Sequence, residues 1–256
     1  MSSLSAEFAR LSQPVMDARS ALACAKKVLE ATGFNGAIYD YSPVALSHDG
    51  RLITPSVLEM ENAPSDMAGL WCDDGYYQLD PVQEAALMVS RPFLWNYRGG
   101  KNEVLRRVLS AKHSPVLEYL RNTRLTCGIT VPIRFDGGDL ATFSAIRVDP
   151  EPDFEDDAEH FLAEIGELGL LFHDTVYPGF DAKTRTSQYI HLTARERQCL
   201  RLSAQGLTTK QIAYEIGRSL PTATLHLTSA TRKLGAKTRF QAIALAAHYR
   251  LLEPDA

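Results

Sequence analysis

Residues 192–213 of this 256-residue chain read LTARERQCLRLSAQGLTTKQIA, and residues 219–235 read SLPTATLHLTSATRKLG. Both stretches combine helix-capping residues with apolar residues at helical spacing. Thr193 is followed three residues later by Glu196, which is the pattern of a capping box, and Ser219 is placed to cap a later helix. This pattern predicts two helices joined by a tight turn, a helix-turn-helix, inside a compact helical unit.

The charge distribution singles out the same part of the chain. The net charge is −4, but residues 185–256 carry +7 and residues 1–184 carry −11. A basic helical unit beside an acidic domain is typical of a nucleic-acid-binding tail. Its cations would contact phosphates, whereas the start of the second helix of the motif would contact bases in the major groove. For any single basic side chain, a solvated helix face is the alternative interpretation.

The predicted contacts to double-stranded DNA come from the second and third helices of this unit. They are Lys210, Ser219, Thr222, Thr224, Leu225, His226, Arg232 and Lys233. A fourth helix is predicted over residues 238–249. One helix-turn-helix reads few base pairs, so we expect a homodimer on an inverted-repeat promoter site.

The first 178 residues predict a domain in which helices cover both faces of a sheet. Two apolar strands, 128–135 and 140–148, form a hairpin through the turn at residues 136–139 at the sheet's centre, and a third strand covers 34–41. Helices are predicted over residues 17–33, near 67–71, from 81 to 89, twice between 102 and 121, and over 154–177. The fold class is α+β: an α/β/α sandwich for ligand binding and dimerisation over residues 1–178, a linker over 179–190 and an all-α four-helix domain over 191–256.

Several classes of protein are disfavoured by what the sequence lacks. No apolar run approaches the ~20 residues that span a bilayer, and the first residues lack the layout of a signal peptide, so we expect a cytoplasmic protein without a membrane partner. The four cysteines are far apart and predict neither a metal site nor a disulfide framework. No GxxxxGK[ST], HExxH or GxSxG motif occurs. We therefore expect no catalytic residues and no cofactor. An enzyme built from scattered histidines and carboxylates is the remaining alternative.

The helical unit resembles the LuxR-type helix-turn-helix, whose pattern runs LTxRExxxL, G(x)SxKxIA, SxxTVxxH and KLG. Glu196, Leu200 and Gly206 stand at that family's hallmark positions. Two residues of the groove helix depart from the pattern: Ala223 replaces the usual valine, and Pro221 occupies a place that is usually polar or basic. Proline is tolerated in the first turn of a helix, so Pro221 is compatible with the helix-turn-helix fold. The base preference of the helix stays open.

Residues 15–175 resemble, more weakly, the autoinducer-binding domain of acyl-homoserine-lactone receptors. Asp80-Pro81, Trp95 and Gly128 stand in the order of that family's markers. The resemblance implies that Asp80 accepts the amide N–H of the ligand, that Trp95 packs beside its head group and that apolar walls hold its acyl chain. A plain cap on the helix that begins at Pro81 is the alternative role of Asp80.

The head-group end of this site departs from the family. The resemblance implies a tryptophan and, four residues later, a tyrosine that donate to the lactone and acyl carbonyls, but Met67 and Trp71 occupy these places. Met67 has no N–H to donate, whereas Trp71 does. A one-turn slip, with Trp71 in the first role and Gly75 or Tyr76 in the second, is the alternative. The predicted ligand contacts are Met67, Trp71, Tyr76, Asp80, Trp95, Gly128 and Ser144, with Tyr39, Tyr41 and Tyr77 as further walls or plain core.

Together these features predict a quorum-sensing transcriptional regulator. It would bind an N-acyl-homoserine lactone as its effector in the N-terminal domain and a palindromic promoter site through the helix-turn-helix. The expected partners are double-stranded DNA, the small-molecule autoinducer, a second copy of the chain and RNA polymerase. The alternative is an orphan regulator of the same type that acts without ligand or senses a different small molecule, which the methionine at position 67 favours.

Overall fold

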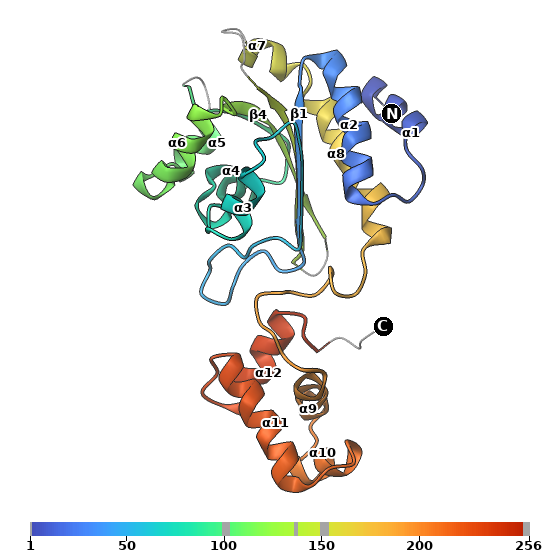
Figure 1. Cartoon of the computed structure of the whole chain (residues 1–256), viewed down its shortest axis with the longest axis vertical. Coiled ribbons are helices and arrows are strands. Elements are labelled where there is room, and N and C mark those ends of the chain that lie inside the picture. Colours follow the sequence, from blue (N-terminus) through green and yellow to red (C-terminus); the bar gives the residue numbers. More distant parts are fainter. Residues whose placement is uncertain (1, 99–102, 136–137, 149–153, 253–256) are drawn as a thin grey trace. The chain divides into compact units, whose positions relative to one another are not determined.

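The chain forms two compact units (Figure 1). Unit 1 comprises residues 1–45 and 52–180, and unit 2 comprises residues 46–51 and 181–256. The chain passes from unit 1 to unit 2 after residue 180, inside the predicted linker of residues 179–190. The structure, a computed structural model, describes residues 2–98, 103–135, 138–148 and 154–252.

Unit 1 is built around a five-stranded antiparallel sheet. Its strands are β1 (Gly36–Ser42), β2 (Val57–Glu61), β3 (Phe93–Asn96), β4 (Cys127–Arg134) and β5 (Leu140–Arg147). The order β2-β1-β5-β4-β3 makes β5 the central strand and leaves β2 and β3 at the edges. The predicted hairpin is present as β4 and β5, with Gly128 opposite Ile146 and Thr130 opposite Ser144. Residues 136 and 137 of its predicted turn lie outside the described residues.

Helices cover both faces of this sheet, which confirms the predicted layered arrangement (Figure 1). One face carries α1 (Ser3–Leu11), α2 (Ala18–Leu29) and α8 (Leu162–Val176). The other carries α3 (Met67–Cys72), α4 (Pro81–Ala86), α5 (Glu103–Val108) and α6 (Ser114–Asn122). Short 3-10 helices occur at η1 (Glu30–Thr32), η2 (Tyr77–Leu79), η3 (Ala111–His113) and η4 (Tyr177–Gly179). Within the described residues, no helix is both long enough and apolar enough to cross a membrane.

The helix predicted over residues 154–177 is divided into two, α7 (Phe154–Glu159) and α8. In the turn between them, the backbone N–H of Phe161 bonds to the carbonyl of Ala158 at 3.0 Å. The turn places the Phe161 ring edge-on against Phe34, with ring centroids 6.5 Å apart. The apolar periodicity continues across the turn, so the sequence pattern alone did not reveal the break.

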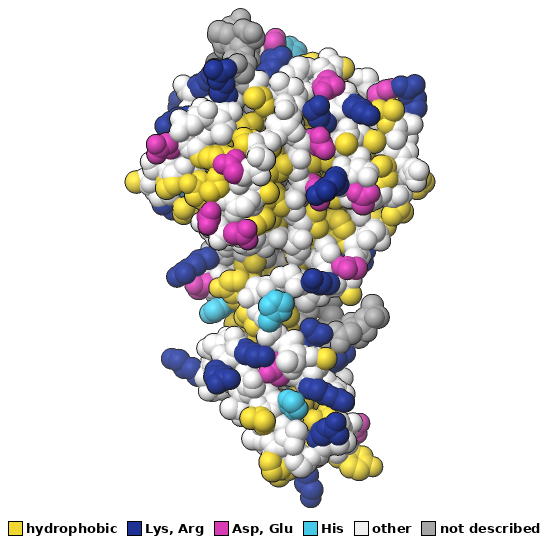
Figure 2. Space-filling view, in the orientation of Figure 1, with side chains coloured by type: hydrophobic (Ala, Val, Ile, Leu, Met, Phe, Trp, Pro, Cys, Tyr) yellow, Lys and Arg dark blue, Asp and Glu magenta, His cyan; other side chains and the backbone are white. Residues whose placement is uncertain are grey.

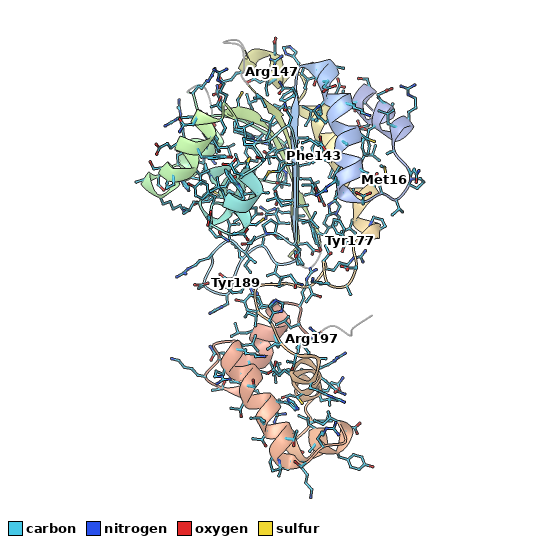
Figure 3. All side chains as sticks on the ribbon, in the orientation of Figure 1. Met16, Phe143, Arg147, Tyr177, Tyr189 and Arg197 are labelled. Atoms are coloured by element: carbon cyan, nitrogen blue, oxygen red, sulfur yellow. The ribbon has the colours of Figure 1, made fainter. Side chains whose placement is uncertain are left out.

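Successive side chains of each strand point to opposite faces of the sheet, so unit 1 has one core on each face. Tyr39 and Tyr41 of β1 and Phe143 of β5 belong to the core beneath α1, α2 and α8. Phe143, in the interior of unit 1 (Figure 3), packs on Phe172 of α8 with ring centroids 5.2 Å apart. Ile38, directly before Tyr39 on β1, packs against the opposite core with α3 to α6. Tyr39 and Tyr41 are therefore core residues on the face away from the α3 to α6 side.

Unit 2 contains the four predicted helices. They are α9 (Ala194–Ala204), α10 (Thr209–Glu215), α11 (Leu220–Lys233) and α12 (Arg239–His248). Each helix begins at a hydroxyl cap, since Thr193, Thr208, Ser219 and Thr238 all accept the backbone N–H three residues later. These caps satisfy N–H groups that a helix start would otherwise leave unpaired. The helix-turn-helix predicted from the sequence is thereby confirmed as α10 and α11.

Candidate ligand cavity and DNA-binding surface

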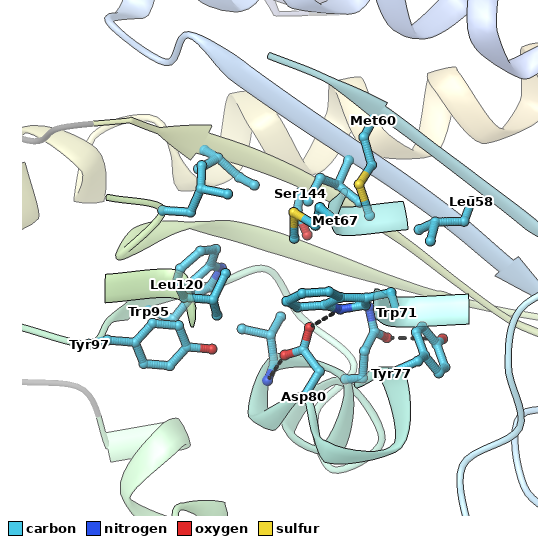
Figure 4. A pocket seen from close by; sticks show the side chains of 15 residues that line it. Leu58, Met60, Met67, Trp71, Tyr77, Asp80, Trp95, Tyr97, Leu120 and Ser144 are labelled. Atoms are coloured by element: carbon cyan, nitrogen blue, oxygen red, sulfur yellow. Dashed lines mark hydrogen bonds between the residues drawn. The ribbon is translucent and has the colours of Figure 1, made fainter. Parts of the chain in front are cut away.

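A cavity lies inside unit 1, between the sheet and the layer of α3, α4 and α6 (Figure 4). Its walls are mostly apolar, with a few polar groups from separate elements, as is usual for small-molecule sites. The lining residues are Ile38, Leu58, Met60, Met67, Trp71, Tyr77, Asp80, Val82, Gln83, Trp95, Tyr97, Leu120, Leu125, Ser144 and Ile146. The cavity volume is about 30 Å³, which suffices for one or two water molecules.

Asp80 supplies a carboxylate to this cavity. Its Oδ1 accepts the backbone N–H of Val82 at 2.9 Å and so caps α4. Its Oδ2 accepts the indole N–H of Trp71, from α3, at 2.9 Å (Figure 4). Burial raises the pKa of Asp80 above its ordinary value, against the lowering effect of the Trp71 hydrogen bond. The cap and a role in the cavity are compatible, because the two oxygens have different partners.

A second buried carboxylate, Asp40 of β1, fixes the segment that carries Asp80. It accepts hydrogen bonds from the Tyr77 hydroxyl and the Gln83 amide, each at 2.8 Å, and from the Thr142 hydroxyl. Tyr77 and Gln83 lie three residues before and after Asp80, whereas Asp40 and Thr142 face each other on β1 and β5. Burial raises the pKa of Asp40 to about 6 despite these bonds. These hydrogen bonds attach the chain segments before and after Asp80 to the sheet.

Trp95 and Ser144 are joined through a hydroxyl on the strand between them. The Trp95 indole N–H donates to the Thr130 hydroxyl at 2.9 Å, and the Thr130 and Ser144 hydroxyl oxygens lie 2.8 Å apart. The Trp95 ring lies over Gly128, where β3 pairs with β4. A Cβ at Gly128 would lie 2.7 Å from this ring and 2.5 Å from the carbonyl oxygen of Ala145. Gly128 therefore provides room for Trp95.

We expect Gly128→Ala to lower the free energy of unfolding by about 2 kcal/mol, because the added methyl overlaps both the Trp95 ring and a backbone oxygen. Thermal unfolding followed by tryptophan fluorescence measures this effect, since Trp71 and Trp95 both line the cavity. Gly69→Ala is the matched control: a Cβ at Gly69 meets nothing within 4 Å, and alanine favours the helix there. A melting temperature of Gly128→Ala equal to that of the control would contradict this account of the packing.

Five of the predicted ligand contacts line the cavity. They are Met67, Trp71, Asp80, Trp95 and Ser144. Gly128 and Tyr76 are not among the lining residues. The Tyr76 ring instead packs on Trp71, with ring centroids 5.5 Å apart. Of the aromatic walls suggested by the sequence, Tyr77 does line the cavity.

Asp40 and Tyr97 belong to this site, although neither was predicted from the sequence. A signal was available for each. Asp40 is an acidic residue inside an otherwise apolar strand, where a carboxylate requires buried partners. Tyr97 lies two residues after Trp95, so strand alternation directs both rings to the same side. Neither signal reveals the partner residues, which come from distant parts of the chain.

The helix-turn-helix presents one face of α11 to solvent. Thr224, Leu225 and Arg232 are exposed, whereas Ala223 and Leu227 are buried against the other helices. Leu225 is 66% exposed, and an apolar side chain on a groove-reading helix suits contact with a thymine methyl group. Of the remaining predicted DNA contacts, Lys210 and Ser219 are exposed, and Thr222 and His226 are partly buried.

Glu196 of α9 joins this helix to α11. Its carboxylate accepts the backbone N–H of Thr193, the Ser229 hydroxyl and the Lys233 ammonium group, each at 2.7 Å. Burial alone would raise the pKa of Glu196, but the bonds from Lys233, Ser229 and Thr193 outweigh it and lower the pKa to about 2. Lys233, predicted as a DNA contact, is thus engaged in an ion pair within unit 2, which the sequence did not predict.

Exposed cations remain on unit 2. Lys210, Arg218, Arg232 and Lys237 are all exposed. Figure 2 shows Lys and Arg side chains over the visible face of the α9 to α12 region with few acidic ones, whereas acidic side chains are frequent on unit 1. Such an excess of positive charge attracts the phosphate backbone of DNA and makes its binding salt-dependent.

Comparisons with known proteins agree with this division of roles. Residues 17–176 match the autoinducer binding domain family, and residues 191–246 match the luxR family of bacterial regulatory proteins. The transcriptional activator protein VanR of Vibrio anguillarum is 29% identical over 217 residues, which cover 82% of this chain and 84% of VanR.

Two solved structures share the fold. SdiA in complex with octanoyl-rac-glycerol has a TM-score of 0.56 at 18% identity and covers 99% of this chain and 96% of its own. The N-acylhomoserine lactone dependent factor CepR2 from Burkholderia cenocepacia has a TM-score of 0.51 at 16% identity and covers 68% of this chain and 94% of its own. At these identities the likeness concerns the fold alone.

Proposed function

Because this chain belongs to the LuxR family of autoinducer-binding transcriptional regulators, we propose that it is a quorum-sensing regulator whose effector is an N-acyl-homoserine lactone. The lactone binds in the cavity of unit 1, and unit 2 binds an inverted-repeat promoter site as part of a homodimer. The choice of ligand depends on one observation, the Asp80 carboxylate buried in a mostly apolar cavity. A buried carboxylate gives a directional, charge-assisted bond to one amide N–H.

The cavity must widen to hold such a ligand. Its volume of about 30 Å³ is far below what an acyl chain occupies. Met60 and Met67 both line it, and methionine side chains change shape at little energetic cost. Leu58 and Leu120 provide further apolar wall for the acyl chain. Displacement of these side chains exchanges contacts within the core for contacts with the ligand, so the ligand should stabilise unit 1.

A second candidate is a regulator of the same family that senses another small molecule or acts without ligand. Two observations favour it. Met67 lines the cavity and offers no hydrogen-bond donor. The Trp71 indole N–H, the donor that the family resemblance assigns to the acyl carbonyl, is bonded to Asp80 instead. A lactone would therefore have to separate Trp71 from Asp80 or share that carboxylate with it.

The two candidates differ in what the purified protein retains. We expect the full chain, produced in cells supplied with a mixture of N-acyl-homoserine lactones, to retain one of them at close to one molecule per chain. Denaturation and mass spectrometry of the released small molecule measure this, and protein produced without lactones is the control. Recovery of a chemically distinct molecule from both preparations would support the second candidate and contradict the first.

A further inference from the structure

Tyr97 lines the cavity, and its hydroxyl has no hydrogen-bond partner within the described residues. The residue follows the edge strand β3 and continues its pairing, because its backbone N–H donates to the carbonyl of Thr126 at 2.7 Å. Its ring packs against Trp95 with ring centroids 5.2 Å apart. Tyr97 is only 7% exposed, so its hydroxyl is shielded from bulk solvent.

The other hydrogen-bonding side chains of the cavity are already bonded to protein atoms. Trp71 donates to Asp80, and Tyr77 donates to Asp40. Trp95 donates to a threonine hydroxyl that in turn bonds to Ser144. A buried hydroxyl without a partner costs free energy, so its presence in a folded protein requires an explanation. Among these described lining residues, Tyr97 is therefore the one whose hydroxyl has no bond to the protein.

The chemistry of Tyr97 suits donation rather than acceptance. Burial, together with the nearby Asp80 carboxylate, raises the pKa of Tyr97 well above its ordinary value. The side chain consequently keeps its proton near neutral pH. Figure 4 shows its hydroxyl directed into the cavity on the side of Asp80. One end of the cavity thus offers a carboxylate acceptor and a phenolic donor.

We propose that Tyr97 determines ligand specificity by donating its hydroxyl to a carbonyl oxygen on the ligand's head group. This inference rests on the proposed function, in which Asp80 accepts the amide N–H of an acyl lactone. Met67, at the place where the family resemblance implies a donor to the lactone carbonyl, has no N–H or O–H. Tyr97 supplies a donor from a different element, at the end of β3 beside Trp95.

The test compares a ligand that has the ring carbonyl with one that lacks it. N-octanoyl-homoserine lactone and N-octanoyl-cyclopentylamine are titrated into the full chain and into Tyr97→Phe. We expect Tyr97→Phe to bind the lactone about tenfold more weakly and the cyclopentylamide unchanged, which is the loss of one hydrogen bond. Equal weakening of both ligands, or no weakening of either, would overturn the proposal.

A second measurement on the ligand-free protein separates this inference from the proposed function. Tyr97→Phe removes an unpartnered hydroxyl, so its melting temperature should equal or exceed that of the wild type. Tyr77→Phe is the matched control from the same cavity. It removes the donor to Asp40, so its melting temperature should fall by several degrees.

The two measurements distinguish failure of the proposed lactone function from failure of the proposed role of Tyr97. If the wild type binds neither probe nor a lactone of shorter or longer acyl chain, the proposed lactone function fails and the ligand-free comparison decides the inference alone. If Tyr97→Phe then melts as low as Tyr77→Phe, the Tyr97 hydroxyl has a structural partner in the protein and the proposal is overturned. If it melts at or above the wild-type temperature, the hydroxyl is available and the proposal is supported.

Discussion

Glu196→Ala should lower the free energy of unfolding of unit 2 by about 3 kcal/mol and abolish DNA binding. The substitution removes the acceptor for three groups at once: the Thr193 N–H, the Ser229 hydroxyl and the Lys233 ammonium group. A hydrogen bond to a charged group contributes about 1.5–3 kcal/mol. Three donors lose their acceptor, but the Lys233 side chain is 36% exposed and water replaces part of its interaction, so about 3 kcal/mol is expected in total. The bonds join α9 to α11, so the groove-reading helix loses its support.

Hydrogen exchange followed by mass spectrometry measures this effect separately in each unit. Peptides from α9 and α11 should exchange faster in Glu196→Ala, whereas peptides from the sheet of unit 1 should not change. Glu215→Ala, an exposed glutamate at the end of α10, is the matched control and should exchange like the wild type. Identical exchange of α9 and α11 in both variants would contradict the role assigned to Glu196.

The contribution of Glu196 should also depend on pH. Its pKa is about 2 in the folded protein, below the ordinary value of 4.5. A lowered pKa stabilises the folded state fully above the unfolded value and loses that effect as the pH falls through the folded value. The stability difference between the wild type and Glu196→Ala should therefore be complete at pH 7 and shrink between about pH 4.5 and pH 2.

Asp80→Asn should weaken binding of the effector by about 100-fold. Asparagine keeps an oxygen that can accept the Val82 N–H, so the cap of α4 survives. Its amide group offers N–H donors where Oδ2 now accepts the Trp71 indole, so two donors would face each other. Loss of a charge-assisted bond to the ligand costs about 1.5–3 kcal/mol, and the upper part of this range corresponds to roughly 100-fold in Kd.

Equilibrium titration of a lactone retained by the wild type measures this loss. Asp74→Asn is the matched control, because Asp74 is exposed and follows α3 near the same cavity segment in the sequence. It should bind as the wild type does. Intact binding by Asp80→Asn would show that the ligand does not need the carboxylate, whose role is then confined to its bonds with Val82 and Trp71.

Local patterns in the sequence were sufficient for unit 2 and for the centre of the sheet. The capping box of Thr193 and Glu196 is complete within four residues, and the caps at Thr208 and Ser219 are equally local. The strands β4 and β5 are mostly apolar and follow each other in the chain, so a short turn suffices to pair them. In these regions the information needed for structure lies inside each segment.

The edges of the sheet and the polar groups of the cavity were not predictable in this way. The edge strands β2 and β3 have only five and four residues. The two glutamates of β2 give this segment a composition that is also common in loops. Asp40 finds its partners at Tyr77, Gln83 and Thr142, which are 37 to 102 residues away in the sequence. That network depends on how the helices pack on the sheet, which no local pattern specifies.

The ion pair between Lys233 and Glu196 was not predictable for the same reason: it depends on how helices pack. Lysine near the end of a helix in a basic unit suggests a phosphate contact, and its pairing with Glu196 emerges only when α9 packs against α11. The proposed DNA contacts at Lys210, Leu225 and Arg232 are exposed. Among the described interactions, none of these side chains forms an ion pair or hydrogen bond within unit 2.

Calorimetric titration of the full chain with N-acyl-homoserine lactones of short, medium and long acyl chains tests the central claim most directly. We expect at least one lactone to bind at about one molecule per chain with a Kd in the micromolar range or below, and Asp80→Asn to lower this affinity by about 100-fold. The absence of binding heat and of thermal stabilisation for every lactone, with a folded wild-type protein, would contradict it.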